Sequence, residues 1–441
     1  MAKIFGTDGV RGVANSELTC ELVIKLVREA AFVLKDKFKN KKIIILRDTR
    51  ISSEMFEHAV AAGVCSSGMN ALILGIMPTP AASFLVKKMQ AAAAVVISAS
   101  HNPFEFNGIK FFDGDGYKLN DETERQIEEN VNEPKNSNLP VGGELGKVFY
   151  EDAAIESYTE HLAQKFTEDL CNLKVAVDCA NGAASVCARS LFRKLGIEYE
   201  LLFDSPDGTN INRNCGSTNL NALAQRVVDG GFDLGVAFDG DADRCLAVDE
   251  KGRILDGDHI MAACGLDLFK SGKLMKNSIV GTPMSNLGFV NFLEKSGIRF
   301  VETKIGDKHI SKKILENGYN FGGEQSGHMI FNDVSSTGDG LLTAILFINT
   351  LIKNNFKASE VFEMFIKFPQ FIKNITVKKE DDFFENSKIK EVINQSEKIL
   401  GGSGRVFVRK SGTEPMVRIM VQSGEKDLFE EVRRLYEQPW N

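Results

Sequence analysis

The sequence predicts an α/β protein of several domains, in which short buried strands alternate with helices. Three observations support this. A length of 441 residues exceeds what one hydrophobic core normally serves. Apolar residues recur at helical spacing between Thr19 and Phe38, and the strand-like run IIIL (43–46) follows directly. The theme returns at AVVIS (94–98), and such short apolar strands between helices imply sheets covered on both faces.

The same alternation continues in the second half of the chain. The strand-like LKVAVDCA (173–180) leads into the helix-like segment AASVCARSLFRKLG (183–196). A further buried strand is expected at DLGVAF (233–238), after a helical pattern. Beyond Phe368, a strand-like run, a charged stretch and a closing helix-like segment predict a small α+β domain.

Three stretches indicate domain boundaries. The polar run NEPKNSNLPVGGE (132–144) has the composition of a linker, the composition shifts around DEKGRILDGD (249–258), and a third boundary is expected near Phe368. No internal repeat is visible at a fixed period. We therefore expect domains at 1–148, 149–252, 253–367 and 368–441.

Bulk properties narrow the function classes. The composition, with 43% hydrophobic and 26% charged residues, is that of an ordinary globular protein. A net charge of −7 argues against nucleic acid as a partner, so an anionic substrate would need local cations or a metal. The eight cysteines are scattered without metal-site spacing and read as reduced thiols. Neither a signal peptide nor a membrane span is recognisable, so we expect a cytoplasmic protein that does not bind membranes.

The loop SASHNP (98–103) offers a possible nucleophile. It follows a strand and presents Ser98 and Ser100 beside His101, and a Pro that cannot continue a strand. Spacing alone does not decide between the two serines. Since serine and asparagine are common turn formers, a neighbouring Ser-His pair is by itself more often structural than catalytic.

The loop DGDADR (239–244) predicts a magnesium site. Asp239, Asp241 and Asp243 alternate just after a buried strand, and three such carboxylates repel one another unless a hard cation lies among them. The loop also partly matches an EF-hand, with Glu250 at its twelfth position. Against that, Arg244 stands where the sharp turn needs glycine, and the preceding segment is strand-like.

Two further loops have the composition of ligand-binding turns. GGEQSGH (322–328) sets Glu324, Ser326 and His328 on alternate residues, which suits a polyhydroxylated ligand but equally an exposed turn. RKSGTEPMVR (409–418) combines hydroxyls, a glycine and two guanidiniums in a plausible phosphate clamp, the alternative being a solvated turn. Its candidate residues are Arg409, Ser411, Gly412, Thr413 and Arg418.

Taken together and in this order, the serine, metal, sugar and phosphate loops resemble the phosphohexomutase superfamily, over the whole chain. The resemblance implies four domains around a central cleft, three α/β domains with mixed sheets and a smaller C-terminal α+β domain, each contributing one loop. The motifs FGTDGVRG, SASHNPFEFNGIKFF, DCANGAAS, MSNLG, GGEQSGH and TGDGLLTA are most similar to members that act on glucosamine phosphates. Departures at GTPMSN, RKSGTEP and RDTRISS affect loop shape more than polar groups.

The resemblance also assigns roles. Ser100 would carry the phosphoryl group, with His101, Lys110 and Arg11 at the reacting centre and Lys110 as the candidate proton acceptor. One Mg²⁺ would be held by three aspartates and the Ser100 phosphate. The sugar contacts would be Glu324, Ser326 and His328, and the non-reacting phosphate would be bound by Arg409, Ser411, Gly412, Thr413 and Arg418.

The implied reaction interconverts the 6- and 1-phosphates of a hexosamine through a phosphoserine and a hexose 1,6-bisphosphate, and feeds UDP-N-acetylglucosamine synthesis. The expected partner is a small sugar phosphate, and the chain would be a monomer or homodimer. Glucose or mannose phosphate would react by the same mechanism. Two other classes stay open: an aspartate-nucleophile phosphatase acting through Asp239, and a calcium-binding protein built on residues 239–250.

Overall fold

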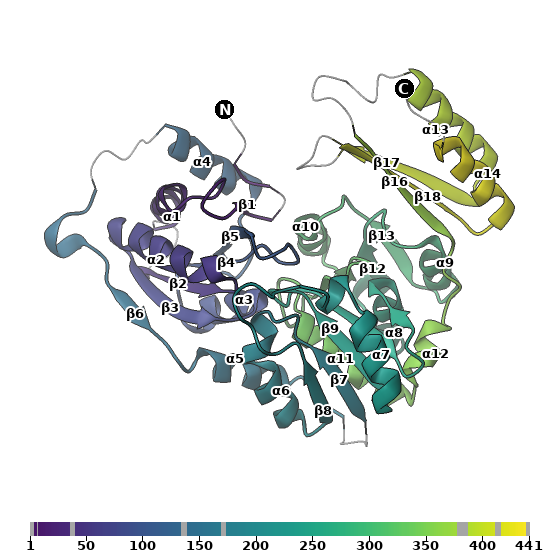
Figure 1. The fold of residues 1–441 in the computed structure, drawn as a ribbon, viewed down its shortest axis with the longest axis horizontal. Helices are drawn as coiled ribbons and strands as arrows, with labels where there is room; N and C mark the ends of the chain where they lie inside the picture. The colour runs from purple at the N-terminus through teal and green to yellow at the C-terminus, as the bar shows by residue number, and fades with distance from the viewer. Residues whose placement is uncertain are drawn as a thin grey trace.

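The computed structural model describes residues 4–6, 8–35, 40–133, 139–168, 173–376, 387–410 and 416–437. Its strands form four sheets that follow one another along the chain (Figure 1). Helices pack against each of them, and the predicted α/β class is confirmed. None of the described helices has both the length and the apolar character needed to cross a membrane.

The first sheet has the order β1-β5-β4-β2-β3-β6, with β5 and β1 antiparallel to their neighbours. Helix α1 begins as predicted, where the Thr19 hydroxyl accepts a hydrogen bond from the Leu22 N–H (3.3 Å), but it ends at Leu34; residues 36–39 are not described. The elements are β1 (Val10–Val13), α1 (Cys20–Leu34), β2 (Lys42–Arg47), α2 (Ile51–Ser66), β3 (Asn70–Ile76), α3 (Thr79–Lys88), β4 (Ala93–Ile97), β5 (Phe106–Asp113), α4 (Asp121–Asn132), a 3₁₀ turn (Gly142–Glu144) and β6 (Val148–Tyr150).

The second sheet has the order β11-β10-β9-β7-β8. The segment expected to be one helix is divided at Cys187, because its first turn stays bonded to the 239–244 loop: the Ala183 N–H donates to the Gly240 carbonyl (2.8 Å). The elements are α5 (Ala154–Ala163), β7 (Lys174–Asp178), a 3₁₀ turn (Ala183–Val186), α6 (Ala188–Leu195), β8 (Glu198–Leu202), a 3₁₀ turn (Gly216–Thr218), α7 (Asn221–Gly230), β9 (Leu234–Phe238), β10 (Cys245–Asp249) and β11 (Ile254–Leu255).

The third sheet has the order β13-β12-β14-β15 and the fourth β16-β18-β17. The third domain contains α8 (Gly257–Lys270), a 3₁₀ turn (Met275–Asn277), β12 (Ser278–Gly281), α9 (Leu287–Lys295), β13 (Arg299–Glu302), α10 (Asp307–Asn317), β14 (Phe321–Gly323), β15 (Met329–Phe331), α11 (Gly340–Asn354) and α12 (Ala358–Phe362). The C-terminal domain contains β16 (Gln370–Thr376), α13 (Ser387–Leu400), β17 (Gly404–Lys410), β18 (Met416–Ser423) and α14 (Lys426–Glu437).

One arrangement recurs in all four sheets. A strand is followed by an antiparallel neighbour, in the pairs β4–β5, β9–β10, β14–β15 and β17–β18. The connections, residues 98–105, 239–244, 324–328 and 411–415, are the four loops that the sequence singles out, though the last lies outside the described residues. The unequal spacing of these returns along the chain explains why no repeat of fixed period is visible.

The hydrophobic cores show how firmly the domains are joined. One apolar cluster contains Leu46 of the first sheet, Phe238 of the second and Phe321 of the third, so these domains share a core. The C-terminal domain has a separate core around Ile419 and Tyr436. It lies beside α9 and β13 of the third domain, apart from the first domain (Figure 1). The first three domains are therefore packed as one body more tightly than the fourth is packed on them.

Candidate active site

Ser100 is aimed at the metal loop. It lies in the β4–β5 return, is 1% exposed, and has a φ of 53°, a left-handed conformation that is uncommon for a residue other than glycine. Its hydroxyl donates a hydrogen bond to Asp239 Oδ2 (2.6 Å) and lies 3.4 Å from His101 Nδ1. The side chain therefore faces a carboxylate that comes from a different domain.

Buried polar contacts hold this loop in place. The Ser100 carbonyl accepts from the Arg50 guanidinium and the Asn212 amide, both at 2.9 Å. Asp48 accepts from Arg50 Nε (2.8 Å) and from the Ser98 hydroxyl (2.7 Å). Ser98 therefore points toward Asp48, whereas Ser100 points toward the aspartates of the metal loop. The spacing of the two serines in the sequence does not make this distinction. Asp48 and Arg50, both in the segment RDTR (47–50), support the loop.

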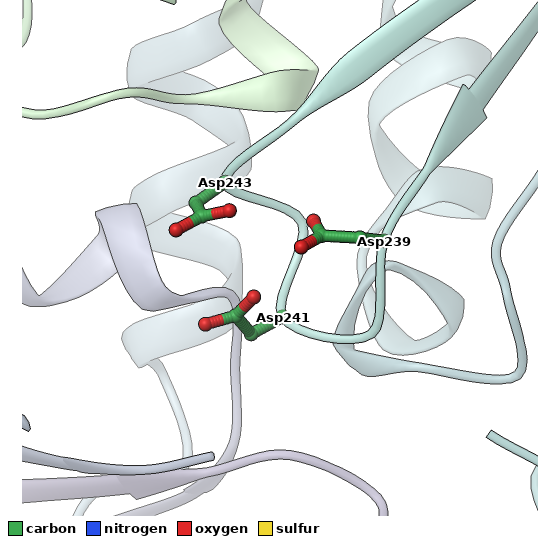
Figure 2. Close-up of side chains that lie close together, drawn as sticks. All are labelled: Asp239, Asp241 and Asp243. Carbon is green, nitrogen blue, oxygen red and sulfur yellow. The ribbon is translucent and has the colours of Figure 1, made fainter. Parts of the chain in front are cut away.

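The three predicted metal ligands come together. Oxygen atoms of Asp239, Asp241 and Asp243 lie within 4.8 Å of one another, all three residues are buried, and Figure 2 shows their carboxylates around one space. Burial and the neighbouring Asp243 and Asp241 raise the pKa of Asp239 well above its usual value. Asp241 Oδ1 and Asp243 Oδ1 have no hydrogen-bond partner among the described residues. Buried, unpartnered carboxylate oxygens fit a magnesium ion.

The EF-hand alternative does not fit this geometry. The loop joins the antiparallel strands β9 and β10, whereas an EF-hand loop joins two helices. Glu250, which would have to be the twelfth-position ligand, accepts instead from the N–H of Ser359 (3.0 Å) and from its hydroxyl. The carboxylate is therefore turned away from the three aspartates.

Cationic side chains surround the acids. Lys110 is 1% exposed, and its Nζ lies 2.7 Å from Asp241 Oδ2 and 2.9 Å from Asp8 Oδ2. Burial lowers the pKa of Lys110, but the carboxylates of Asp241, Asp8 and Asp243 raise it more, so the net shift is upward. Lys110 is a cation in this arrangement. Its role as a proton acceptor stays a prediction.

A cavity of about 520 Å³ opens beside these groups. Arg11 and His101 line it, as the sequence leads us to expect of reacting-centre residues. Burial and the cations Arg244 and Arg11 lower the pKa of His101 to about 4, so its imidazole is neutral at pH 7. Arg244 Nε lies 3.9 Å from oxygens of both Asp239 and Asp243 and also lines the cavity. The cavity can thus bind an anion through Arg11 and Arg244, and the neutral imidazole of His101 can hydrogen-bond a hydroxyl group.

The predicted sugar loop divides its side chains. Glu324 and His328 line the cavity, but His328 is 3% exposed and lies 3.6 Å from both Asp243 and Asp307. Glu324 Oε1 accepts from the Gly306 N–H (3.1 Å). Ser326 is exposed and does not line the cavity, so alternate spacing does not bring all three side chains together here. Their sugar contacts stay a prediction.

The predicted phosphate clamp is described only at its ends. Ser411, Gly412 and Thr413 lie outside the described residues. Arg409 of β17 and Arg418 of β18 are direct cross-strand partners and line a hollow of about 270 Å³. Burial and the neighbouring guanidinium of Arg418 lower the pKa of Arg409. Two like charges side by side are unfavourable unless an anion lies between them.

Several site residues are not identified by the sequence patterns. Asp8 lies inside the FGTDGVRG motif but carried no assigned role, and Arg244 counted only against an EF-hand. Lys118 and Asp307 follow ordinary polar segments, GDGY and KIG, and give no sequence signal. A spatial partner more than one hundred residues away defines the place of each of the last two.

Comparison with known proteins covers almost the whole chain. Its segments match descriptions of the phosphoglucomutase/phosphomannomutase domains: alpha/beta/alpha domain I at residues 2–138, domain II at 156–252, domain III at 256–368, and the C-terminal domain at 372–435. The chain is 49% identical over 431 residues to a phosphoglucosamine mutase of Desulforamulus reducens, covering 98% of this chain and 97% of the relative. It is 48% identical to the Bacillus subtilis protein of the same name, covering 99% and 98%.

Solved structures share the fold. A phosphoglucomutase/phosphomannomutase family protein from Burkholderia thailandensis superposes with a TM-score of 0.82 at 20% identity, covering 99% of this chain and 96% of that one. Aspergillus fumigatus N-acetylphosphoglucosamine mutase, solved in complex with GlcNAc-6P and magnesium, has a TM-score of 0.69 at 18% identity, covering 98% and 94%.

Proposed function

The chain belongs to the phosphoglucomutase/phosphomannomutase family, and we propose that within it the protein interconverts glucosamine 6-phosphate and glucosamine 1-phosphate through a phosphoserine at Ser100. One observation carries the proposal most directly. The Ser100 hydroxyl lies 2.6 Å from Asp239, so the nucleophile and the metal loop form one centre. The three carboxylates matter because they can hold a cation, and a cation beside Ser100 offsets the negative charge of the transferred phosphoryl group.

The reaction consists of two transfers of the same kind. The bond between phosphorus and Ser100 Oγ breaks as a new P–O bond forms at the free hydroxyl of the sugar phosphate. The hydroxyl proton goes to a base, and the departing Ser100 oxygen takes up a proton. Lys110 is the candidate base, and it can accept a proton only after it has lost its own, because its raised pKa makes it a cation in this arrangement. The resulting 1,6-bisphosphate turns around in the cavity, and its other phosphate returns to Ser100. Positioning and charge neutralisation carry most of the catalysis in such transfers.

The residues present fit one magnesium ion per chain, held by Asp239, Asp241 and Asp243 with an oxygen of the Ser100 phosphate. When bound, the ion neutralises charge on the transferring group. Arg11 and Arg244 line the cavity on the same side and can bind the phosphate oxygens. Arg409 and Arg418 would hold the phosphate that is not reacting, in both halves of the cycle.

An amino sugar is the substrate that the relatives' names support. Glu324 lines the cavity, and a carboxylate is a suitable partner for the ammonium group at C2 of glucosamine. The described cysteines are free thiols, which agrees with a reducing cytoplasm. The proposal places the enzyme before the formation of UDP-N-acetylglucosamine, as a monomer or homodimer.

A coupled assay with the phosphates of glucosamine, glucose and mannose tests the substrate. We expect the highest kcat/KM for glucosamine phosphate, and a smaller preference in Glu324→Gln because the variant lacks the anionic partner. Equal kcat/KM for the three sugars in the wild type would contradict the proposed substrate. It would leave the phosphoserine mechanism standing.

Intact mass tests the mechanism against the aspartate-nucleophile phosphatase. A phosphoserine survives acid, whereas an acyl phosphate on Asp239 generally does not. After incubation with a hexose 1,6-bisphosphate and acid treatment, we expect one retained phosphoryl group in the wild type and none in Ser100→Ala. Loss of the group from the wild type in acid would favour the phosphatase.

A further inference from the structure

A closed circuit of charged side chains runs through three domains. Each member contacts the next, and acids alternate with basic groups except where the circuit closes within the 239–244 loop. In order, its members are Asp241, Lys110, Asp8, Lys118, Asp307, His328 and Asp243. The separations are 2.7 Å for Asp241–Lys110, 2.9 Å for Lys110–Asp8, 2.5 Å for Asp8–Lys118 and 3.6 Å for both His328 contacts. Lys118 and Asp307 are in direct contact.

The pair Lys118–Asp307 is the step of this circuit that crosses from the first domain to the third. Lys118 precedes α4, and its ammonium bonds both Asp8 and Asp307. Asp307 is the first residue of α10, and its Oδ2 contacts both Lys118 and His328. Both side chains are only 13% exposed. Because the pair is buried, removing one partner is costly in free energy: it leaves the other charge uncompensated.

The turns that precede Lys118 and Asp307 are both fixed by hydrogen bonds within the third domain or to it. The turn before Lys118 is fixed to the third domain, since the Gly116 carbonyl accepts from the Ser336 hydroxyl (2.6 Å). Gly306, before Asp307, has a φ of 117° that only glycine adopts readily, and its N–H donates to Glu324. The pair therefore joins two rigid turns, and one of them is bonded to the sugar loop.

We propose that Lys118 is a positioning residue, whose pairing with Asp307 sets the sugar loop of the third domain against the reacting centre of the first. Through Asp307 it places a negative charge 3.6 Å from His328 Nε2, the atom that accepts from the Gly338 N–H (3.2 Å), and through Asp8 it shares a carboxylate with Lys110. The inference rests on the proposed function, because it assigns these turns a part in aligning substrate and Ser100. Small misplacements of reacting groups are costly, on the order of 10²-fold for about 1 Å.

The chain offers a matched control at the same interface. Lys308 of α10 pairs with Asp121 (2.8 Å) and Glu124 (2.7 Å) of α4, so it too links the third domain to the first. It does not belong to the circuit and does not line the 520 Å³ cavity. A residue that only ties the two domains together should behave as Lys308 does.

The experiment compares Lys118→Met, Lys118→Arg and Lys308→Met by kcat, KM and thermal unfolding. We expect Lys118→Met to lower kcat by 10-fold to 100-fold, with KM changed less than about threefold, because alignment rather than binding is lost. Lys308→Met should keep kcat within about threefold, since the ion pairs that it breaks with Asp121 and Glu124 lie outside the circuit. Lys118→Arg should recover most of the loss. Equal kcat in Lys118→Met and Lys308→Met, or a purely KM effect, would overturn the inference.

Thermal unfolding shows whether each variant is folded, and a double-mutant comparison tests whether the two residues act as a unit. If the pair acts as a unit, Lys118→Met combined with Asp307→Asn should lose no more kcat than the worse single variant. Additive losses would show that the two residues act separately and would overturn the inference. A wild type inactive on glucosamine phosphates would instead defeat the proposed function, so the two failures are distinguishable.

Discussion

The reacting centre and the predicted phosphate clamp differ in the signs of the charges that lie side by side. Around Ser100, nearly every buried acid has a cation or hydroxyl beside it, and Asp241 alone accepts from Thr79 (2.6 Å) and Lys110 (2.7 Å). At the clamp, Arg409 and Arg418 lie side by side across a hollow. The first region is organised before substrate arrives. We expect the second to be completed by a bound anion.

The same contrast appears in the packing. The loops of the first two domains are supported by a shared core, whereas the clamp belongs to a domain with its own core. That domain is seated on the third through the Asn286 side chain, which accepts from the Phe368 N–H (2.9 Å) and donates to the Phe368 carbonyl (3.0 Å). The MSNLG motif thus forms the seat. The Arg405 guanidinium and the Gln422 side chain add polar contacts to Ser285 and Leu287. Polar interfaces between domains favour domain motion, and closure would exclude water from the reacting centre.

The largest expected effect lies in the organised region. Ser100→Ala removes the phosphoryl acceptor and should lower kcat by at least on the order of 10³-fold. Ser98→Ala removes two hydrogen bonds, the one that its hydroxyl donates to Asp48 and the one that it accepts from the Ser100 N–H (2.9 Å), each worth about 1 kcal/mol, and should keep a substantial part of the activity. Steady-state assays of both variants check the assignment. Normal turnover by Ser100→Ala would refute the mechanism.

A second test removes one charge from the metal loop. Asp241→Asn keeps a side-chain oxygen for Thr79 but weakens the cation site, and we expect about 10²-fold lower kcat at saturating Mg²⁺, since a metal supplies several kcal/mol to such transfers. Titration with Mg²⁺ should show weaker activation than in the wild type. Full wild-type activity in excess chelator would contradict a magnesium requirement.

A third test probes the clamp. Arg418→Ala loses a charge-assisted hydrogen bond worth about 1.5–3 kcal/mol, so kcat/KM should fall about tenfold or more. The loss should be equal in the forward and reverse directions, because one clamp serves both phosphates. Assays in both directions check it. A defect confined to one direction would contradict the shared clamp, and an unchanged enzyme would place the arginine outside the site.

The smallest expected effect concerns the pH dependence of thermal unfolding, through Asp258, which contacts the Asn286 that joins the third domain to the C-terminal domain. Asp258 is buried and accepts from the Asn286 N–H (2.7 Å), and burial together with Asp256 raises its pKa to about 8. The folded protein therefore retains a proton that the unfolded chain releases above about pH 4, so this stabilisation is lost as the pH rises through about 8.

Asp258→Asn cannot ionise and escapes that loss. Relative to the wild type, its melting temperature should be a few degrees more favourable at pH 8 than at pH 5. Thermal unfolding at the two pH values measures the difference. The same offset at both pH values would mean that Asp258 does not titrate in the folded protein. Asp243 behaves differently. Burial raises its pKa, but Lys110 and His328 lower it more, so this buried carboxylate does not lose stability as the pH rises.

The sequence predicted the features that depend on neighbouring residues in the chain. The acids of DGDADR follow a buried strand and come together as alternation after a strand end suggests. The Ser100 loop was placed correctly at a strand end, but its partner Asp239 is 139 residues away. Lys118 and Asp307 could not be predicted, because each gains its meaning from an ion pair across domains. Ser326 shows the converse: favourable spacing does not fix where an exposed turn points.

The return from a strand into an antiparallel neighbour, repeated in each sheet, separates scaffold from chemistry. Side chains in loops at equivalent exits can diverge without disturbing strand pairing, because backbone groups make the pairing, including the hydrogen bond from the Glu324 N–H to the His328 carbonyl (2.9 Å). For protein engineering, residues 324–328 are therefore a segment whose side chains can be replaced. Grafting that segment from a family member with another sugar preference should change substrate choice while leaving the folding of β14 and β15 intact, provided that Glu324 and His328 keep their hold on the turn at 306–307.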